Sequence, residues 1–461
     1  MDKKRVVITG LGTINPIGIN VKDFWNNCLQ GKTNIQKIPQ HWFSYSNFNS
    51  TIWAPIPSID YSEHFITKIE QKQLDITTLL SICAIQEAFN SAKLEYVKYN
   101  EKKNTYKIPS INNKKAGVFI GTGIGGVSTL GSCWSFQILN NQKKRLDDLL
   151  NNNEIKNNKK LQKDLSNIYE KMILPNRFNP FAVSMIMSNA SSANLAIKFD
   201  LQGTNHTYNS ACASGTVAIG NGFKQIKNGE LDIVIAGGVE YMYDEYGALF
   251  YAFDTLKTLV NNKKHTDMEK ANRPFDKDRS GFLYAQGGCG IIITEELEHA
   301  KKRNAPIIAE ILSYSENCDA HNVMVIENSG NAIKRMLGKA LTDANINSDQ
   351  VDYINAHGTG TIINDEVESK IIEELFGNKI LVNSTKSLIG HTLGASGAIE
   401  AVVTALSIKN KTTHICKNLK NPVRDLNFIT KINTHPIKTA ITQSFGFGGH
   451  NACLILKEYT Q

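Results

Sequence analysis

The chain has 461 residues, of which 41% are hydrophobic and 20% are charged. This composition is ordinary for a globular protein, and the length predicts either more than one domain or one large duplicated fold. No stretch of about 18 apolar residues occurs, which excludes an ordinary transmembrane helix. The opening MDKKRVVITGLG has no apolar run before a cleavage site, so we expect no signal peptide.

The cysteines point to a reducing environment. The chain has eight of them, no two form a CxxC pair, and most lie in apolar runs such as SICAIQEAF and GGCGIII. Buried free thiols therefore fit better than a disulfide framework. We expect the protein in the cytoplasm.

The net charge of +8 favours acidic partners without identifying one. Much of the excess lies in Lys/Asn-rich stretches such as NNNEIKNNKKLQKD, and residues 133–171 read as a charged helical insertion on the surface. These runs lack interleaved aromatic residues, and the chain shows no DNA- or RNA-binding module, so nucleic-acid binding is disfavoured.

Strand-like and helix-like segments alternate, which predicts an α/β fold with largely parallel sheets covered on both faces. After RVVITG, DFWNNCLQG reads as a helix, and DIVIAGG is a later strand. The first half runs strand, helix, strand and strand–helix: RVVITG from Arg5, residues 74–94, AGVFIG from Ala116, and a strand ending at Ala211 before ACASGTVAIG. The second half repeats this order: IIAEILSYS, NAIKRMLGKALTDA, VDYINAHG, and KSLIGH before SGAIEAVVTALSIKN. We therefore predict a duplicated core, with halves at residues 1–305 and 306–461 and a catalytic site at their junction.

Cys212 is a candidate nucleophile. We expect it directly after a strand and at the start of a helix, where unpaired N–H groups favour the thiolate. The small residues Ala213, Ser214 and Gly215 leave room for a substrate. An inert buried cysteine is an equally good interpretation of this residue taken alone.

Two histidines sit in glycine-rich junctions. His357 follows a strand in NAHGTGT, and His391 follows Lys386 in KSLIGHTLGASG. Glu400, inside the next helix, is placed to pair with Lys386. A core histidine in a turn is the plain alternative for each. Near the C-terminus, SFGFGG surrounds Phe445 and Phe447 with glycines, which suits either a gate over an apolar site or a tight strand connection.

The set of motifs is more specific than any one of them. RVVITGLGTINPIG, FIGTGIGG, YNSACASGTVAIG, RPFDKDRSGF, NAHGTGT, NSTKSLIGHTLGASG and SFGFGG occur in an order that resembles the β-ketoacyl-acyl-carrier-protein synthases over nearly the whole chain. This resemblance implies a thiolase-like fold of two similar halves in five layers, α-β-α-β-α, and a homodimer. It also implies an enzyme that condenses malonyl and acyl groups carried by acyl carrier protein, with no cofactor or metal of its own.

The resemblance implies roles for individual residues. Cys212 matches the family's nucleophile, His357 and His391 its catalytic histidines, and Lys386 its catalytic lysine. Phe447 matches the gating phenylalanine, and its N–H with that of Cys212 would form an oxyanion hole. Ile124 matches a residue that lines the acyl pocket of the family. Lys68 and Lys72 match lysines that dock the carrier, although lysines on a solvated helix are nearly as good an interpretation.

Three departures from the family pattern concern details of the site rather than the reaction. Gln286 and Asn355 stand where acidic residues are usual, and His450 stands where threonine is frequent. A bound-ion site or the setting of a loop is what these changes put in doubt.

Four other interpretations fit the sequence less well. A dinucleotide site at Gly121-x-Gly123-x-x-Gly126 lacks the second strand and acidic residue it requires, because QILNNQKKRLDD follows. A zinc site from Cys212, His357 and His391 lacks ligands at short spacing. A degradative thiolase would carry a second catalytic cysteine, and Cys453 lies in a strand-like run. A non-catalytic partner subunit, such as a chain-length factor, usually lacks the nucleophile that this chain retains.

Overall fold

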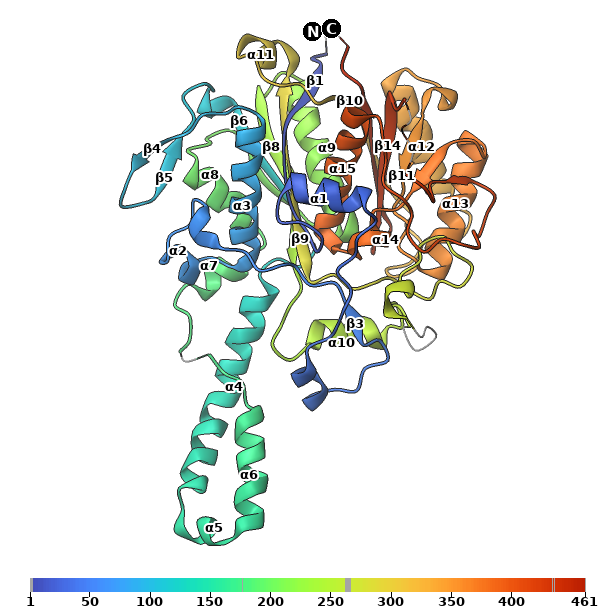
Figure 1. Cartoon of the computed structure of the whole chain (residues 1–461). Coiled ribbons are helices and arrows are strands. Elements are labelled where there is room, and N and C mark those ends of the chain that lie inside the picture. The colour runs from blue at the N-terminus through green and yellow to red at the C-terminus, as the bar shows by residue number, and fades with distance from the viewer. Residues whose placement is uncertain (1–2, 176, 262–266, 433, 435, 461) are drawn as a thin grey trace.

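One mixed sheet of eleven strands runs through the described part of the computed structural model, which covers residues 3–175, 177–261, 267–432, 434 and 436–460 (Figure 1). The strands of the first half are β1 (Val6–Ile14), β6 (Ala116–Gly121), β7 (Asn205–Tyr208), β8 (Ile233–Tyr241) and β9 (Gly287–Glu296). Those of the second half are β10 (Ala309–Cys318), β11 (Tyr353–Asn355), β12 (Leu381–Asn383), β13 (Asn427–Phe428), β14 (Thr439–Gly446) and β15 (His450–Lys457).

The two halves of the sheet have the same strand order. From edge to centre, the first half runs β7-β6-β8-β9-β1, and the second runs β12-β11-β14-β15-β10 with β13 added at its edge. In each half three parallel strands are followed by an antiparallel one and then by the first strand of that half. β1 and β10 pair antiparallel at the centre, with Val6 opposite Ile311.

The two halves of the sheet form two layers, and helices lie between them and on both outer faces. Six of the helices correspond in pairs between the halves: α3 (Ile76–Ser91) with α12 (Asn331–Ala344), α8 (Ala190–Lys198) with α13 (Ile362–Phe376), and α9 (Ser214–Lys227) with α15 (Ser396–Asn410). α9 and α15 pack on each other and on strands of both halves, and the outer pairs cover the outer faces (Figure 1). The result is the predicted α-β-α-β-α arrangement with two similar halves.

The central helices approach each other through small residues. A Cβ at Gly215 in α9 would lie 2.8 Å from the backbone nitrogen of Ala398 in α15, and a Cβ at Gly397 would lie 3.0 Å from that of Thr216. Both separations are shorter than a carbon atom allows, so glycine at both positions permits this contact. α15 is buried from Ser396 to Ile408, and its sequence is mainly apolar, with Glu400 as its buried acidic residue.

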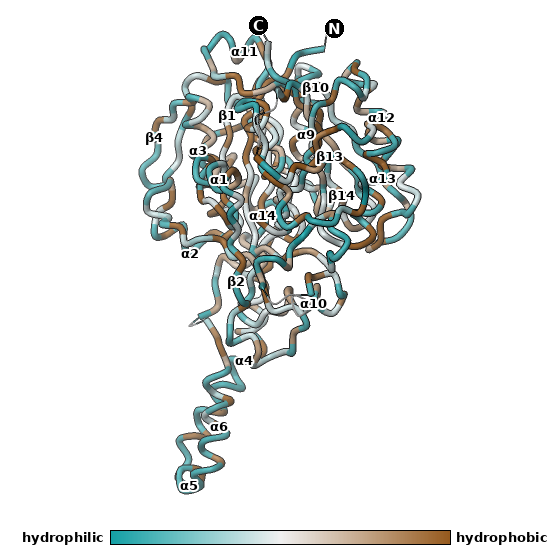
Figure 2. The backbone as a smooth tube through the Cα atoms, turned by 45° about the vertical axis from the view of Figure 1, so that its right-hand side comes forward, coloured by the Kyte–Doolittle hydropathy of each residue, from teal (hydrophilic) through white to brown (hydrophobic). Residues whose placement is uncertain are grey.

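A helical arm projects from the first half. α4 (Val127–Leu150), α5 (Asn153–Asn157) and α6 (Lys159–Lys171) extend away from the sheet and are mainly hydrophilic (Figures 1 and 2). This arm contains the residues that the sequence assigned to a helical surface insertion. After the Gly121–Gly126 segment, α4 continues through QILNNQKKRLDD, where a dinucleotide fold requires its second strand.

The remaining elements are short. The other helices are α1 (Val21–Leu29), α2 (Glu70–Gln73), α7 (Ala182–Ile186), α10 (Ala248–Thr255), α11 (Leu297–Lys302) and α14 (Lys386–Ile389). Two ribbons are formed by β2 (Gln36–Lys37) with β3 (Ile52–Trp53) and β4 (Val97–Asn100) with β5 (Thr105–Lys107). No helix in the described ranges combines the length and apolar character that crossing a bilayer requires.

One predicted boundary is wrong. The strand expected to end at Ala211 ends at Tyr208, and Ala211–Ala213 form a separate 3-10 turn before α9. The division at residue 305 falls between α11 and β10 and stays a prediction. All eight cysteines are free, and all but Cys318 are buried, as the sequence predicted.

Candidate active site

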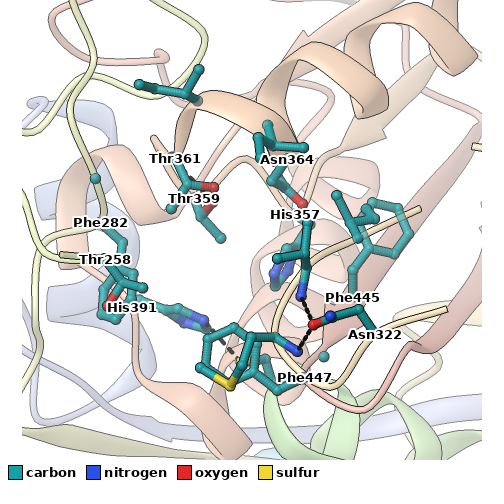
Figure 3. Close-up of a pocket in the computed structure, with 18 of the residues that line it drawn as sticks. Thr258, Phe282, Asn322, His357, Thr359, Thr361, Asn364, His391, Phe445 and Phe447 are labelled. Atoms are coloured by element: carbon teal, nitrogen blue, oxygen red, sulfur yellow. Dashed lines mark hydrogen bonds between the residues drawn. The ribbon is translucent and has the colours of Figure 1, made fainter. Parts of the chain in front are cut away.

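A cavity of about 300 Å³ opens between the two halves and ends at Cys212. His357, His391, Phe445 and Phe447 lie around its inner end, and Thr359 and Thr361 lie on its wall (Figure 3). The first half supplies the cysteine, and the second half supplies both histidines, as the repeat in the sequence predicted for a site at the junction.

The turn that carries Cys212 is held in an unusual conformation. Ala211 has φ +49°, a left-handed value that costs an ordinary L-residue about 1–2 kcal/mol. The hydroxyl of Ser214 fixes this turn, because it accepts a hydrogen bond from Ser210 N at 2.9 Å and donates one to Ala211 O at 2.6 Å. The turn therefore sets the sulfur at the end of the cavity, one turn before α9 begins.

Backbone from the SFGFGG segment packs directly on this turn. A Cβ at Gly446 would lie 2.6 Å from Ser210 O and 3.1 Å from Cys212 N, so only glycine permits this approach. Burial raises the pKa of the Cys212 thiol to about 12, and the Lys386 charge and the N–H of Phe447 lower it. The expected preference for the thiolate is therefore wrong, because desolvation raises the pKa of Cys212 more than the Lys386 charge and the backbone N–H groups lower it.

His391 is a hydrogen-bond donor to the sulfur. Its Nε2 lies 3.1 Å from Cys212 Sγ, and Leu393 N donates to its Nδ1 at 3.3 Å. Since Nδ1 accepts a hydrogen bond, the ring proton resides on Nε2. Ser396 Oγ lies 2.9 Å from the same Nδ1 and supports this tautomer.

His357 has the same tautomer for a different reason. Lys386 Nζ lies 3.2 Å from His357 Nδ1 and donates to its carbonyl oxygen at 2.7 Å. Because the ammonium only donates, Nδ1 must accept, and Nε2 of His357 carries the proton. Lys386 also forms the predicted ion pair with Glu400, at 2.5 Å and fully buried, and burial raises the pKa of Glu400 to about 7.

Both histidines are held neutral. Burial lowers the pKa of His357 and of His391 well below the usual 6.5, and the nearby Lys386 charge lowers both further. The rings lie 5.5 Å apart, edge to face. Two neutral imidazoles with N–H groups at the end of a buried cavity are suited to stabilise a developing oxyanion.

Sequence reasoning missed the group that anchors the His357 loop. Glu368, buried in α13, accepts hydrogen bonds from the backbone N–H groups of His357 and Gly358, both at 2.7 Å, and from Gln443 Nε2 at 2.7 Å. Burial raises the pKa of Glu368 to about 7. The signal was available in Asp365 and Glu368, two acidic residues three apart on one face of the helix after NAHGTGT.

The phenylalanines lie at the cavity, as expected. Phe445 is buried with its ring 5.4 Å from His357, and Phe447 is half-buried beside two glycines with positive φ, Gly448 and Gly449. Val323 O accepts from Gly448 N at 2.7 Å and ties the Phe447 loop to the cavity rim.

Ile124, which we expected in the acyl pocket, is not at the cavity, and the two lysines expected to dock the carrier lie on the surface. The side chain of Ile124 is 37% exposed and does not line the cavity, although its N–H bonds Glu240. Lys68 and Lys72 are exposed in and before α2, across the molecule from α13 and α14 (Figure 1). The proposed roles of Ile124, Lys68 and Lys72 therefore stay predictions.

The departure at Asn355 is accommodated by a neutral network. Its Nδ2 donates to Thr385 Oγ1 at 2.8 Å and to Tyr353 and Asn383, and Thr385 Oγ1 lies 3.0 Å from His414 Nε2. Burial lowers the pKa of His414 to about 4. These side chains tie the ends of β11 and β12 together next to Lys386. Gln286 bonds Tyr241 and the N–H of Ile56, and His450 begins β15.

No group of three His, Cys, Asp or Glu residues within the described ranges is arranged to hold an ion. The Lys386 ammonium beside His357 would also repel a second cation. The zinc interpretation is therefore not supported by the arrangement of the three residues it invoked.

Comparison with known proteins agrees with this site. Residues 3–300 match the family described as "Beta-ketoacyl synthase, N-terminal domain", and residues 308–420 match its C-terminal domain. The chain belongs to the β-ketoacyl synthase family. Members of this family are condensing acyltransferases, and the arrangement of Cys212 with two neutral histidines is in keeping with that chemistry.

Relatives of this β-ketoacyl synthase match it along its length. The chain is 35% identical to "3-oxoacyl-[acyl-carrier-protein] synthase 2" of Synechocystis sp. over 100% of this chain and 99% of that one. It is 33% identical to the chloroplastic synthase I of Arabidopsis thaliana, over 99% and 87%. Among solved structures, a ketosynthase in complex with a type II PKS acyl-carrier protein is similar with a TM-score of 0.82 and 27% identity, over 100% of both chains.

Proposed function

We propose that this chain is a 3-oxoacyl-[acyl-carrier-protein] synthase that lengthens a Cys212-bound acyl chain by two carbons, in the synthesis of fatty acids or related polyketides. The observation that carries the proposal is the placing of Cys212 Sγ against His391 Nε2–H, with His357 Nε2–H beside it, at the end of one cavity. Relatives named as such synthases match the full chain.

In the first half-reaction Cys212 attacks the carbonyl of an acyl thioester on a carrier protein. The new C–S bond forms as the old one breaks, and the thiol proton goes to the departing carrier thiolate. The N–H groups of Cys212 and Phe447 are proposed to bind the oxyanion. The raised pKa of Cys212 keeps the thiol protonated until substrate arrives, and His391 Nε2–H then stabilises the forming thiolate.

In the second half-reaction a malonyl thioester enters and loses carbon dioxide. The electron pair of the broken C–C bond forms an enolate, which attacks the acyl-enzyme and releases Cys212 as a thiolate that takes a proton from solvent. We propose that His357 and His391 donate their Nε2 protons as hydrogen bonds to the enolate oxygen, each worth roughly 3–4 kcal/mol. Burial keeps both rings neutral, and the fixed charge of Lys386, which is paired with Glu400, adds to this effect.

The reaction needs no cofactor of the enzyme's own in this proposal. Decarboxylation and the thioester bond supply the driving force, and the phosphopantetheine arm belongs to the carrier. The eight free cysteines favour a reducing compartment such as the cytoplasm.

The surface supports a homodimer. Val183, Met187 and Ile197 are 76%, 49% and 67% exposed on and beside α7 and α8, next to the unpaired edge of β7. An apolar patch at an open sheet edge is typical of an interface. A second copy there would also bury Ile124, whose proposed place in the acyl pocket then depends on the dimer. An Ile124→Ala enzyme should accept longer acyl chains, and an unchanged chain-length profile would argue against this role.

Carrier docking by Lys68 and Lys72 is a further part of the proposal. Both are exposed and the carrier is acidic, so changing both to Glu should raise the KM for carrier-bound substrate. An unchanged KM would leave these residues as solvated lysines.

The deciding experiment incubates purified enzyme with medium-chain acyl-carrier protein and malonyl-carrier protein, and follows the carrier species by intact mass. We expect a 3-oxoacyl product two carbons longer, which is absent with Cys212→Ser. A partner subunit is not favoured, because Cys212 and both histidines are present in a reactive arrangement. Decarboxylation without product in the unaltered protein would reverse that preference.

A further inference from the structure

One wall of the cavity consists of three short segments that lie side by side. Phe282 N donates to Thr258 O at 2.9 Å, and Gly281 N donates to Gly360 O at 3.0 Å. These bonds align residues 257–259, 280–282 and 359–361 along the cavity. Hydroxyl side chains from each segment line it: Thr258, Ser280, Thr359 and Thr361.

Lys257 stands at the outer end of this wall. It is exposed, and it is the one lysine or arginine among the described residues that line the cavity. No ion pair involves it in the described part of the chain. Its backbone is fixed with φ +57° after α10, because its N–H bonds Asp254 O at 3.0 Å while the Asp254 carboxylate accepts from Asn49 N and Ser50 N.

The rest of the rim does not compete for this cation. Five other residues that line the cavity are exposed and apolar: Val323, Met324, Val325, Ile362 and Ile363. Asp319 is the one carboxylate in the described lining, and it already accepts from Asn451 Nδ2 at 2.7 Å and from Glu327 N at 3.1 Å. The Lys257 ammonium is therefore free to meet an anion that arrives from outside.

We propose that Lys257 binds the phosphate of the phosphopantetheine arm while its thioester lies at Cys212. The inference rests on the proposed function, and it assigns the cavity mouth to the phosphate end of the arm. The arm carries its reactive sulfur at one end and a phosphate at the other. A cavity that holds the sulfur at its inner end directs the phosphate toward its mouth, where Lys257 supplies a charge-assisted hydrogen bond. The hydroxyls on the wall suit the amides of the arm between the two ends.

The experiment compares three acyl donors that share one acyl group: acyl-pantetheine, acyl-phosphopantetheine and acyl-carrier protein. The rate of Cys212 acylation is followed by intact mass for the unaltered enzyme, Lys257→Glu and Lys257→Met. Lys93→Glu is a matched control, because Lys93 is also exposed and has φ +53° directly after a helix, but does not line the cavity.

The measured quantity is the ratio of kcat/KM for the phosphorylated donor to that for acyl-pantetheine. We expect this ratio to fall about fivefold in Lys257→Met, somewhat more in Lys257→Glu, and to stay constant in Lys93→Glu. An unchanged ratio in the Lys257 variants overturns the inference. So does a loss confined to acyl-carrier protein, because Lys257 would then contact an acidic side chain of the carrier. If the unaltered enzyme accepts none of the three donors, the proposed function itself fails.

Discussion

The two halves of the molecule build the same turn around different residues. In the first half, Ala211–Ala213 precede α9, Ala211 has φ +49°, and Ser214 Oγ accepts from Ser210 N. In the second half, Leu393–Ala395 precede α15, Leu393 has φ +44°, and Ser396 Oγ accepts from Thr392 N. Cys212 and Gly394 are therefore equivalent positions of one repeated design.

The difference shows how a duplicated frame divides the chemistry. Four residues into the central helices, the first half has Ala218 and the second has Glu400, which holds Lys386. The first half thus has an alanine at this position and carries the nucleophile, and the second half carries the buried Lys386–Glu400 pair and both histidines. The reaction needs both because the cavity ends where the two turns meet.

The largest expected effects come from removing one catalytic residue from each half. Cys212→Ala should lower condensation by roughly 10⁴-fold or more while malonyl decarboxylation continues. His357→Ala should lower decarboxylation by about 10²–10³-fold while acylation of Cys212 continues. Intact mass reports the acyl-enzyme, and release of labelled carbon dioxide reports decarboxylation. Loss of both activities in both variants would show that the halves do not act separately.

The next largest effect concerns the buried pair that only the second half has. Lys386→Met should destabilise the fold by about 3–5 kcal/mol, because it leaves Glu400 without a partner. Adding Glu400→Ala makes the helix resemble α9 and should recover part of that loss. Urea unfolding of the single and double variants measures this coupling. Strictly additive losses would mean that the pair is not coupled.

Gly394 tests the equivalence of the two turns. A Cβ there would lie 2.3 Å from Gly123 N and 2.7 Å from Glu240 Oε2, so Gly394→Ala should cost about 1–3 kcal/mol. In α12, Gly338 has no neighbour within 4 Å of its would-be Cβ, and Gly338→Ala should instead stabilise by about 0.5–1 kcal/mol. Unfolding midpoints decide the comparison. Equal stability of the two variants would contradict the claim that steric crowding requires glycine at position 394.

The smallest expected effect is on pH dependence. His357 and His391 have pKa values well below 6.5, so decarboxylation should not decline between pH 7.5 and pH 6. Removing the Lys386 charge raises both pKa values, so the acid limb should move to higher pH in Lys386→Met/Glu400→Ala. A pH–rate profile of each enzyme shows the shift. An acid limb that stays in place would mean that burial alone holds the rings neutral.

The sequence predicted the parts of the site that lie in local patterns. The repeat placed Cys212 and His391 at matching turns, and α12 and α15 begin and end where the periodicity put them. The pairing of Lys386 with Glu400 followed from their spacing before and within one helix.

What the sequence did not predict depends on distant contacts. The thiol pKa follows from burial by residues of both halves, and no local motif encodes that burial. Glu368 reaches the His357 loop from another helix. The strand before Cys212 ends early because Ser210 N bonds Ser214 Oγ, a contact that hydrophobic periodicity does not record.

The arm formed by α4, α5 and α6 is a suitable place to attach a label. Its outer part packs chiefly on itself, and its tip at α5 lies far from the sheet (Figure 1). A fluorescent dye at Asn153–Asn157 would therefore report on the whole enzyme, and a tether at the same place would fix the enzyme to a surface. Neither would touch the cavity. On an immobilised synthase, single binding events of the carrier protein could then be counted, with the label far from the reacting atoms.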